Sequence, residues 1–119
     1  MRARLIGFGE IEIDGERIAH DVVVDRGAVR KRRKGPSKPM RERFGHTPLT
    51  AAEEIPWGPR GSRLLVGTGA HGMLPLADDV RVEALRRGVE LVAVPTAEAC
   101  RLLADVPPAE VWAVLHVTC

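Results

Sequence analysis

The second half of this chain alternates strand and helix patterns, and that alternation most limits the folds open to it. Three short apolar runs are typical of buried strands: Leu64–Val66, Val89–Val94 and Val111–Val117. Residues 78–87 place apolar side chains at helical spacing and end at Gly88, a residue typical of helix C-termini. A second helix is predicted from Thr96, as its N-cap, to Leu103. This βαβαβ pattern predicts parallel strands joined by right-handed crossovers.

The first half of the chain predicts an antiparallel β-meander. Strand patterns cover residues 4–8, 11–14 and 18–24, and Asp14-Gly15 is a hairpin turn signal. Residues 25–48 lack periodicity and are rich in Gly and Pro, which predicts a long surface loop; a short helix is expected over residues 50–55. We therefore expect one domain over 1–119, divided into a β-meander (1–24), a basic loop (25–48) and an α/β portion (49–119).

The composition narrows the functional classes. The 119 residues include two Phe, two Trp and no Tyr, so an aromatic platform for stacking nucleic-acid bases is hard to build. No apolar stretch approaches the roughly 20 residues of a membrane span, and the N-terminus leads into a strand pattern where a signal peptide would have an apolar run. Two cysteines, Cys100 and Cys119, fit a reducing compartment. We expect a cytoplasmic protein with no membrane contact.

Positive charge is concentrated in one segment. Residues 26–43 hold nine Lys or Arg against the single acid Glu42, a net charge of +8, so the rest of the chain carries −6 within the total of +2. Such runs are usually solvated, but this one could contact an acidic protein, a second copy of the chain or nucleic-acid phosphates. The candidate partner-binding residues are Arg30, Lys31, Arg32, Arg33, Lys34, Lys38, Arg41 and Arg43.

A glycine-rich run, Gly67-Thr68-Gly69-Ala70-His71-Gly72, follows the first strand of the βαβαβ pattern and has the letter pattern of a dinucleotide-binding turn. In such a turn the third glycine opens a helix that holds the pyrophosphate. Here the helical pattern starts only near Asp78, and Asp78 and Asp79 would repel a phosphate at its N-terminus. We expect no NAD or FAD. The run is either a ligand-binding loop or a tight strand exit that requires glycine.

The carboxyl ends of parallel strands share one edge of a sheet, where ligands bind in such folds. His116 interrupts the last apolar strand; it is either a ligand donor or acid–base group, or a strand-end histidine bonded to a backbone carbonyl. No catalytic residue is predicted, and the spacing of His and Cys does not fit a structural zinc site. The candidate ligand-binding residues at this edge are Gly67, Thr68, Gly69, His71, Gly72, Thr96, His116 and Thr118.

Four short motifs together resemble a known family. They are Gly67-Thr68-Gly69-x-x-Gly72-Met73-Leu74, Arg86-x-Gly88-Val89-Glu90, Val94-Pro95-Thr96-x-x-Ala99 and Leu115-His116-x-Thr118-Cys119. The chain is similar to the Mth-type small α/β domain family, which includes an adipogenesis-associated protein and mitochondrial complex I assembly factor 3. The resemblance implies a three-layer α/β fold around a mixed β-sheet, with the β-meander supplied by the N-terminal half. It also implies protein contacts in assembly and no established catalysis.

Three hypotheses of function follow. The first is a non-enzymatic binding or assembly module that uses the carboxyl edge and the basic loop to contact another protein or a homo-oligomer mate. The second is a small-molecule-binding protein or unrecognised enzyme with a pocket over Gly67–Gly72. The third is a nucleic-acid binder that uses residues 26–43.

Overall fold

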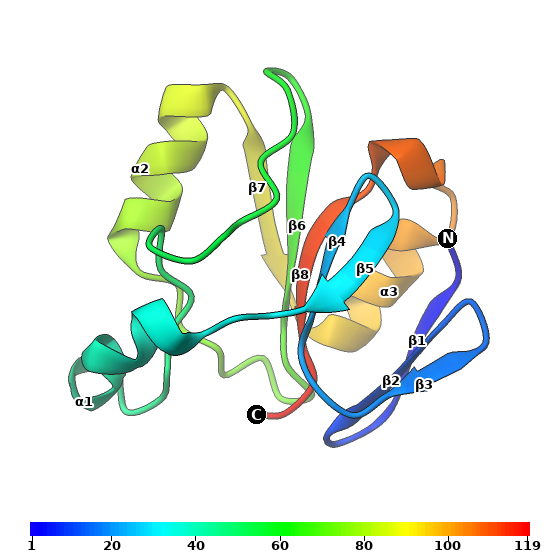
Figure 1. Cartoon of the computed structure of the whole chain (residues 1–119), viewed down its shortest axis with the longest axis horizontal. Helices are drawn as coiled ribbons and strands as arrows, with labels where there is room; N and C mark the ends of the chain where they lie inside the picture. Colours follow the sequence, from blue (N-terminus) through cyan, green and yellow to red (C-terminus); the bar gives the residue numbers. More distant parts are fainter.

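A five-stranded mixed β-sheet forms the centre of the fold (Figure 1). The computed structural model describes all residues, 1–119. The strand order is β5-β4-β8-β6-β7, with β6 parallel to β7 and β8, and β4 antiparallel to β5 and β8. The predicted α/β fold with a mixed sheet and a βαβαβ unit is confirmed. The strand bounds are β4 Val22–Asp25, β5 Ala28–Lys31, β6 Arg63–Thr68, β7 Glu90–Val94 and β8 Trp112–His116.

Two helices make the crossovers, and local sequence signals set their ends. Helix α2 (Asp78–Arg87) ends at Gly88, whose φ of 65° is the left-handed conformation that glycine adopts without strain. Helix α3 (Thr96–Leu103) begins one residue earlier than predicted, because Pro95 is the N-cap and Thr96 is already helical. The Thr96 hydroxyl is instead used in tertiary hydrogen bonds. None of the helices has the length and apolar character that crossing a bilayer would require.

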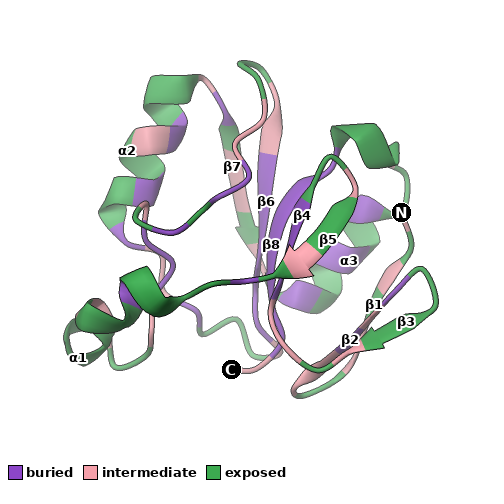
Figure 2. Ribbon diagram, in the orientation of Figure 1, coloured by how far each residue is buried: buried purple, intermediate pink, exposed green.

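Each face of the sheet carries its own hydrophobic core, which gives the fold three layers (Figure 2). Side chains alternate between the faces: Leu65 and Ala113 belong to the core under α3, whereas Leu64 and Val114 belong to the core on the side of α2. Strands that are buried on both faces read as continuous apolar runs. The sequence therefore predicted β6 and β8 from continuous apolar runs, in which apolar and polar residues do not alternate.

A second, three-stranded antiparallel sheet covers the core under α3. It contains β1 (Ala3–Gly7), β2 (Glu10–Ile13) and β3 (Glu16–Ile18), and Asp14-Gly15 forms the predicted turn with positive φ at both residues. The predicted return strand over residues 18–24 is wrong. The chain leaves this sheet after Ile18 and enters the central sheet at Val22, so one apolar run supplies strands to two sheets.

The segment predicted as a basic loop is largely ordered structure. Arg26 and Gly27 take positive φ and turn the chain into β5, which pairs with β4. A 3-10 helix η1 (Gly35–Met40) and a short helix α1 (Arg41–Phe44) follow, and the segment crosses the sheet to the side of α2 (Figure 1). The predicted helix over residues 50–55 does not form. Leu49 and Ile55 instead anchor this stretch in the core beside α2.

Candidate functional site

The ends of the three parallel strands meet at one edge of the central sheet, here called the carboxyl rim. Thr68 at the end of β6 pairs with His116 at the end of β8. Thr96, the first residue of α3, donates its hydroxyl hydrogen to the carbonyl oxygen of His116 (2.6 Å) and accepts the backbone N–H of Gly69 (2.8 Å). The rim thus brings together candidate residues from three separate parts of the sequence.

The glycine-rich run at this rim is bonded to the chain's own tail. The backbone N–H of Ala70 donates to the carbonyl of Thr118 (2.9 Å), and the N–H groups of His71 and Met73 donate to that of Cys119 (3.1 Å each). Gly69 has a φ of +110°, and a Cβ there would overlap the Thr118 carbonyl. Gly69 therefore permits close packing of the tail, and the amides of Ala70, His71 and Met73 are not free to hold a ligand.

Arg32 is the centre of a buried polar network. Its side chain is only 1% exposed and makes a two-point contact with Glu53, with Nε donating to Oε1 and Nη2 to Oε2, each at 2.8 Å. Nη1 donates to Asp21 Oδ2 (3.0 Å) and Nη2 also donates to the carbonyl of Pro48 (3.0 Å). Arg32 therefore holds the basic segment onto the sheet and is buried, whereas its neighbours Lys31 and Arg33 are exposed.

Hydroxyl groups extend this network on the side of Glu53. Ser37 from η1 is fully buried, and its hydroxyl donates to Glu53 Oε2 while lying 2.8 Å from the hydroxyl of Thr50. Burial alone would lower the pKa of Arg32, but hydrogen bonds and charge from Glu53, with the charge of Asp21, raise it above its ordinary value. The guanidinium therefore stays charged, and the buried ions are mutually paired.

Asp21 links this network to His116. Its Oδ1 accepts the backbone N–H of Val117 (2.9 Å), and its Oδ2 lies 2.7 Å from Nδ1 of His116. Burial works to raise the pKa of Asp21, but the hydrogen bond and charge of His116, the Val117 N–H and the charge of Arg32 outweigh it and lower that pKa to about 2. Asp21 is therefore an ionised carboxylate at neutral pH.

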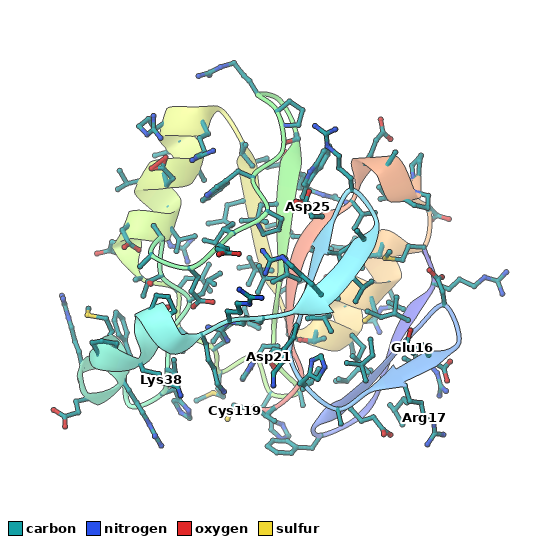
Figure 3. The ribbon with its side chains drawn as sticks, in the orientation of Figure 1. Glu16, Arg17, Asp21, Asp25, Lys38 and Cys119 are labelled. Carbon is teal, nitrogen blue, oxygen red and sulfur yellow. The ribbon has the colours of Figure 1, made fainter.

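A pocket of about 570 Å³ lies where the basic segment faces the carboxyl rim. Figure 3 shows Lys38 from the basic segment, Cys119 from the chain's tail and Asp21 in the same lower part of the view. No Asp or Glu side chain lines this pocket. Its lining consists of Arg32, Lys34, Lys38, Arg41, Gly45, His46, Thr47, His116, Thr118 and Cys119.

The pocket combines residues from both predicted sets. From the rim it takes His116 and Thr118, and from the basic segment it takes Lys34, Lys38 and Arg41. No residue of the glycine-rich run 67–72 lines this pocket, so it is not the pocket that the sequence predicted over that run. Arg33 is exposed and does not line the pocket, although its sequence neighbours Arg32 and Lys34 do.

Sequence reasoning missed the acids that organise the site. Asp21 stands inside a run that reads as one continuous strand, and this interruption by a charged residue was the available signal. Glu53, next to Glu54, reads as solvated helix charge, although its side chain is 4% exposed and paired with Arg32. Cys100 lies in the core, where burial raises the pKa of its thiol to about 11.

Comparison with known proteins places this architecture in a family. Residues 4–104 match the family described as "Protein of unknown function (DUF498/DUF598)". The solved structure of the conserved hypothetical protein PH1505 from Pyrococcus horikoshii OT3 is similar over 100% of both chains, with 30% sequence identity and a TM-score of 0.78. The structure of a protein called MT938 shares the fold at 24% identity, with a TM-score of 0.65, over 99% of this chain and 98% of its own. No curated protein sequence gives a significant match.

Proposed function

Because the chain belongs to the DUF498/DUF598 family of proteins of unknown function, we propose a function from the pocket itself: the protein is a binding module for an anionic group. The observation that carries this proposal is a concave site lined by Lys34, Lys38 and Arg41 with no opposing carboxylate side chain. Cations held near one another repel, and an anion between them relieves that repulsion. Phosphate and carboxylate oxygens are the groups that Lys and Arg bind most strongly.

Arg32 supports this site without being its main ligand contact. Its hydrogen bonds to Glu53, Asp21 and the Pro48 carbonyl use its donors inside the protein. The side chains of Lys34, Lys38 and Arg41, in contrast, make no direct ion pair with any acid. The network therefore fixes the position of the segment whose other cations face the ligand.

The proposal is tested by titrating the protein with pyrophosphate in a calorimeter at constant ionic strength. We expect saturable binding that weakens at least fivefold in Lys34→Gln and in Lys38→Gln. Arg33→Gln is the matched control, because it removes the same charge from the same segment outside the pocket. Absence of binding, or an equal loss in Arg33→Gln, would show that the pocket is not an anion site.

A second candidate function is assembly with a partner protein that presents an acidic segment to this rim. The observation that favours it is an exposed apolar pair beside the chain's tail: Phe8 is 65% exposed with its ring centroid 6.2 Å from that of His71, and Met73 is 56% exposed. The family resemblance to assembly factors agrees with a protein ligand. A Phe8→Ser, Met73→Ser variant should then lose the partner in a pull-down and still bind pyrophosphate, whereas retention of the partner would contradict this candidate.

A further inference from the structure

The hydrogen bonds of His116 determine which of its ring nitrogens can change protonation. Nδ1 lies 2.7 Å from Asp21, and the pKa of that carboxyl is lowered to about 2, so the acid has no proton to give at neutral pH. Nδ1 must therefore carry the hydrogen. Nε2 is the variable nitrogen; it lies 3.2 Å from the hydroxyl of Thr118, and both residues line the pocket. When the ring is neutral, Nε2 accepts a hydrogen bond from the Thr118 hydroxyl. When the ring is charged, the Nε2–H group donates a hydrogen bond to that hydroxyl oxygen.

Two opposing sets of charges act on that proton. Asp21, from the connection between β3 and β4, favours a charged ring. Four cations of the pocket lining disfavour a charged ring. They are Arg32 and Lys34 from the stretch after β5, Lys38 from η1 and Arg41 from α1. His46 and the Cys119 thiol are the other titratable side chains of the lining, and His20 is turned to the backbone carbonyl of Asp21. An anion in the pocket cancels the repulsion from the cations and leaves the attraction of Asp21.

We infer that the pocket takes a phosphate-type dianion, seated against Nε2 of His116 and the Thr118 hydroxyl, and that its binding adds a proton to His116. This inference rests on the proposed anion-binding function and names its ligand class. A charged His116 donates to the dianion, and Thr118, released from donating to Nε2, donates to it as well. By linkage, a ligand that brings a proton with it must bind more tightly at lower pH.

The number of cations and the size of the pocket favour a dianion on a larger molecule. A monoanionic carboxylate would leave three cationic side chains and a charged His116 largely uncompensated. The volume of about 570 Å³ exceeds what one phosphate group fills, which leaves room for the organic part of a phosphomonoester. Thr47 and Thr118 add hydroxyl donors for phosphate oxygens.

The test uses sulfate, a dianion that does not itself titrate near neutral pH, so any proton taken up on binding is taken up by the protein. Calorimetry in two buffers of different protonation enthalpy, at the same pH and ionic strength, counts the protons. We expect uptake of up to about one proton per sulfate, and an affinity that falls by as much as about tenfold per pH unit as His116 loses its charge. Acetate should bind at least tenfold more weakly than sulfate.

Three variants assign the proton. His116→Gln should bind sulfate more weakly and without proton uptake. His46→Gln and Arg33→Gln should still take up a proton when they bind sulfate. Nitrogen-15 shifts of the His116 ring in the unmodified protein, followed against pH with and without sulfate, give the same answer without relying on the stability of a variant. The ring should stay charged to higher pH when sulfate is present.

The outcomes separate this inference from the function on which it rests. Sulfate binding without proton uptake, or uptake that survives in His116→Gln and disappears in His46→Gln, overturns the inference and leaves the anion-binding function in place. Stronger binding of acetate than of sulfate overturns the ligand class. If neither pyrophosphate nor sulfate binds the wild-type protein, the proposed function and the inference fall together.

Discussion

Replacing Arg32 by Met tests the structural role of the buried network. The change leaves Glu53, whose side chain is 4% exposed, and Asp21, at 11%, without their cation. Removing one partner of a buried ion pair costs about 3–5 kcal/mol, because the remaining charge stays buried without compensation. A surface arginine replaced in the same way changes the free energy of unfolding by less than about 0.5 kcal/mol. If Arg32 is a buried anchor, the loss in free energy of unfolding is therefore several kcal/mol larger than if it is an ordinary surface arginine.

The assay is urea unfolding followed by the fluorescence of Trp57 and Trp112, with Arg33→Met as the control in the neighbouring exposed position. We expect a loss of about 3–5 kcal/mol for Arg32→Met and almost none for the control. Adding Glu53→Leu to Arg32→Met should recover part of the loss, because it removes the unpaired carboxylate. A loss below about 1 kcal/mol for Arg32→Met would refute the network as the anchor of the basic segment.

Three further predictions follow from the same geometry. The pKa of Asp21 is about 2 in the folded protein against 3.8 in the unfolded chain. The ionised carboxylate therefore stabilises the fold fully above pH 3.8, and this stabilisation is lost as the pH falls towards 2. Urea unfolding across this range should show that the difference in free energy of unfolding between the wild type and Asp21→Asn narrows by about 2 kcal/mol. Gly69→Ala should lower the free energy of unfolding by more than about 2 kcal/mol, because φ is +110° and the Thr118 carbonyl occupies the space of the Cβ. Gly35→Ala, where nothing lies within 4 Å of the added Cβ, should lower it by under about 1 kcal/mol. Equal melting temperatures for the two variants would contradict this prediction. Thr96→Val removes the acceptor for the Gly69 N–H and the donor to His116 inside a buried site, so chemical denaturation should reveal a loss of about 1–3 kcal/mol, and an unchanged midpoint would argue against the tie between α3 and the rim.

The βαβαβ half of the fold could be predicted because its signals are local. Apolar runs of strand length marked β6, β7 and β8, and Gly88 ends α2 in the left-handed conformation expected of it. Because parallel strands share one carboxyl rim, the sequence also predicted that Thr68, Thr96 and His116 lie together, and they do.

The first half and the pocket could not be predicted because they depend on contacts distant in sequence. Residues 18–24 look like one strand, yet Asp21 accepts hydrogen bonds from His116, Val117 and Arg32, and the chain changes sheets around it. Arg32 has the same chemical character as Arg33, and only the folded chain places Glu53 beside one of them. Burial of a charge is a property of the tertiary environment, which a charge run does not encode.

We expect the basic segment and the carboxyl rim to form one anion site, and a nitrogen-15 HSQC titration with pyrophosphate at constant ionic strength follows both parts at once. Saturable shifts are predicted at residues 34–47 and 116–118, with one dissociation constant fitting both sets. The exposed residues Arg81, Val82 and Leu85 of α2 should not move. Shifts that grow linearly without saturation would show that there is no such site, as would shifts at exposed arginines such as Arg26 and Arg33 that leave His116 unchanged.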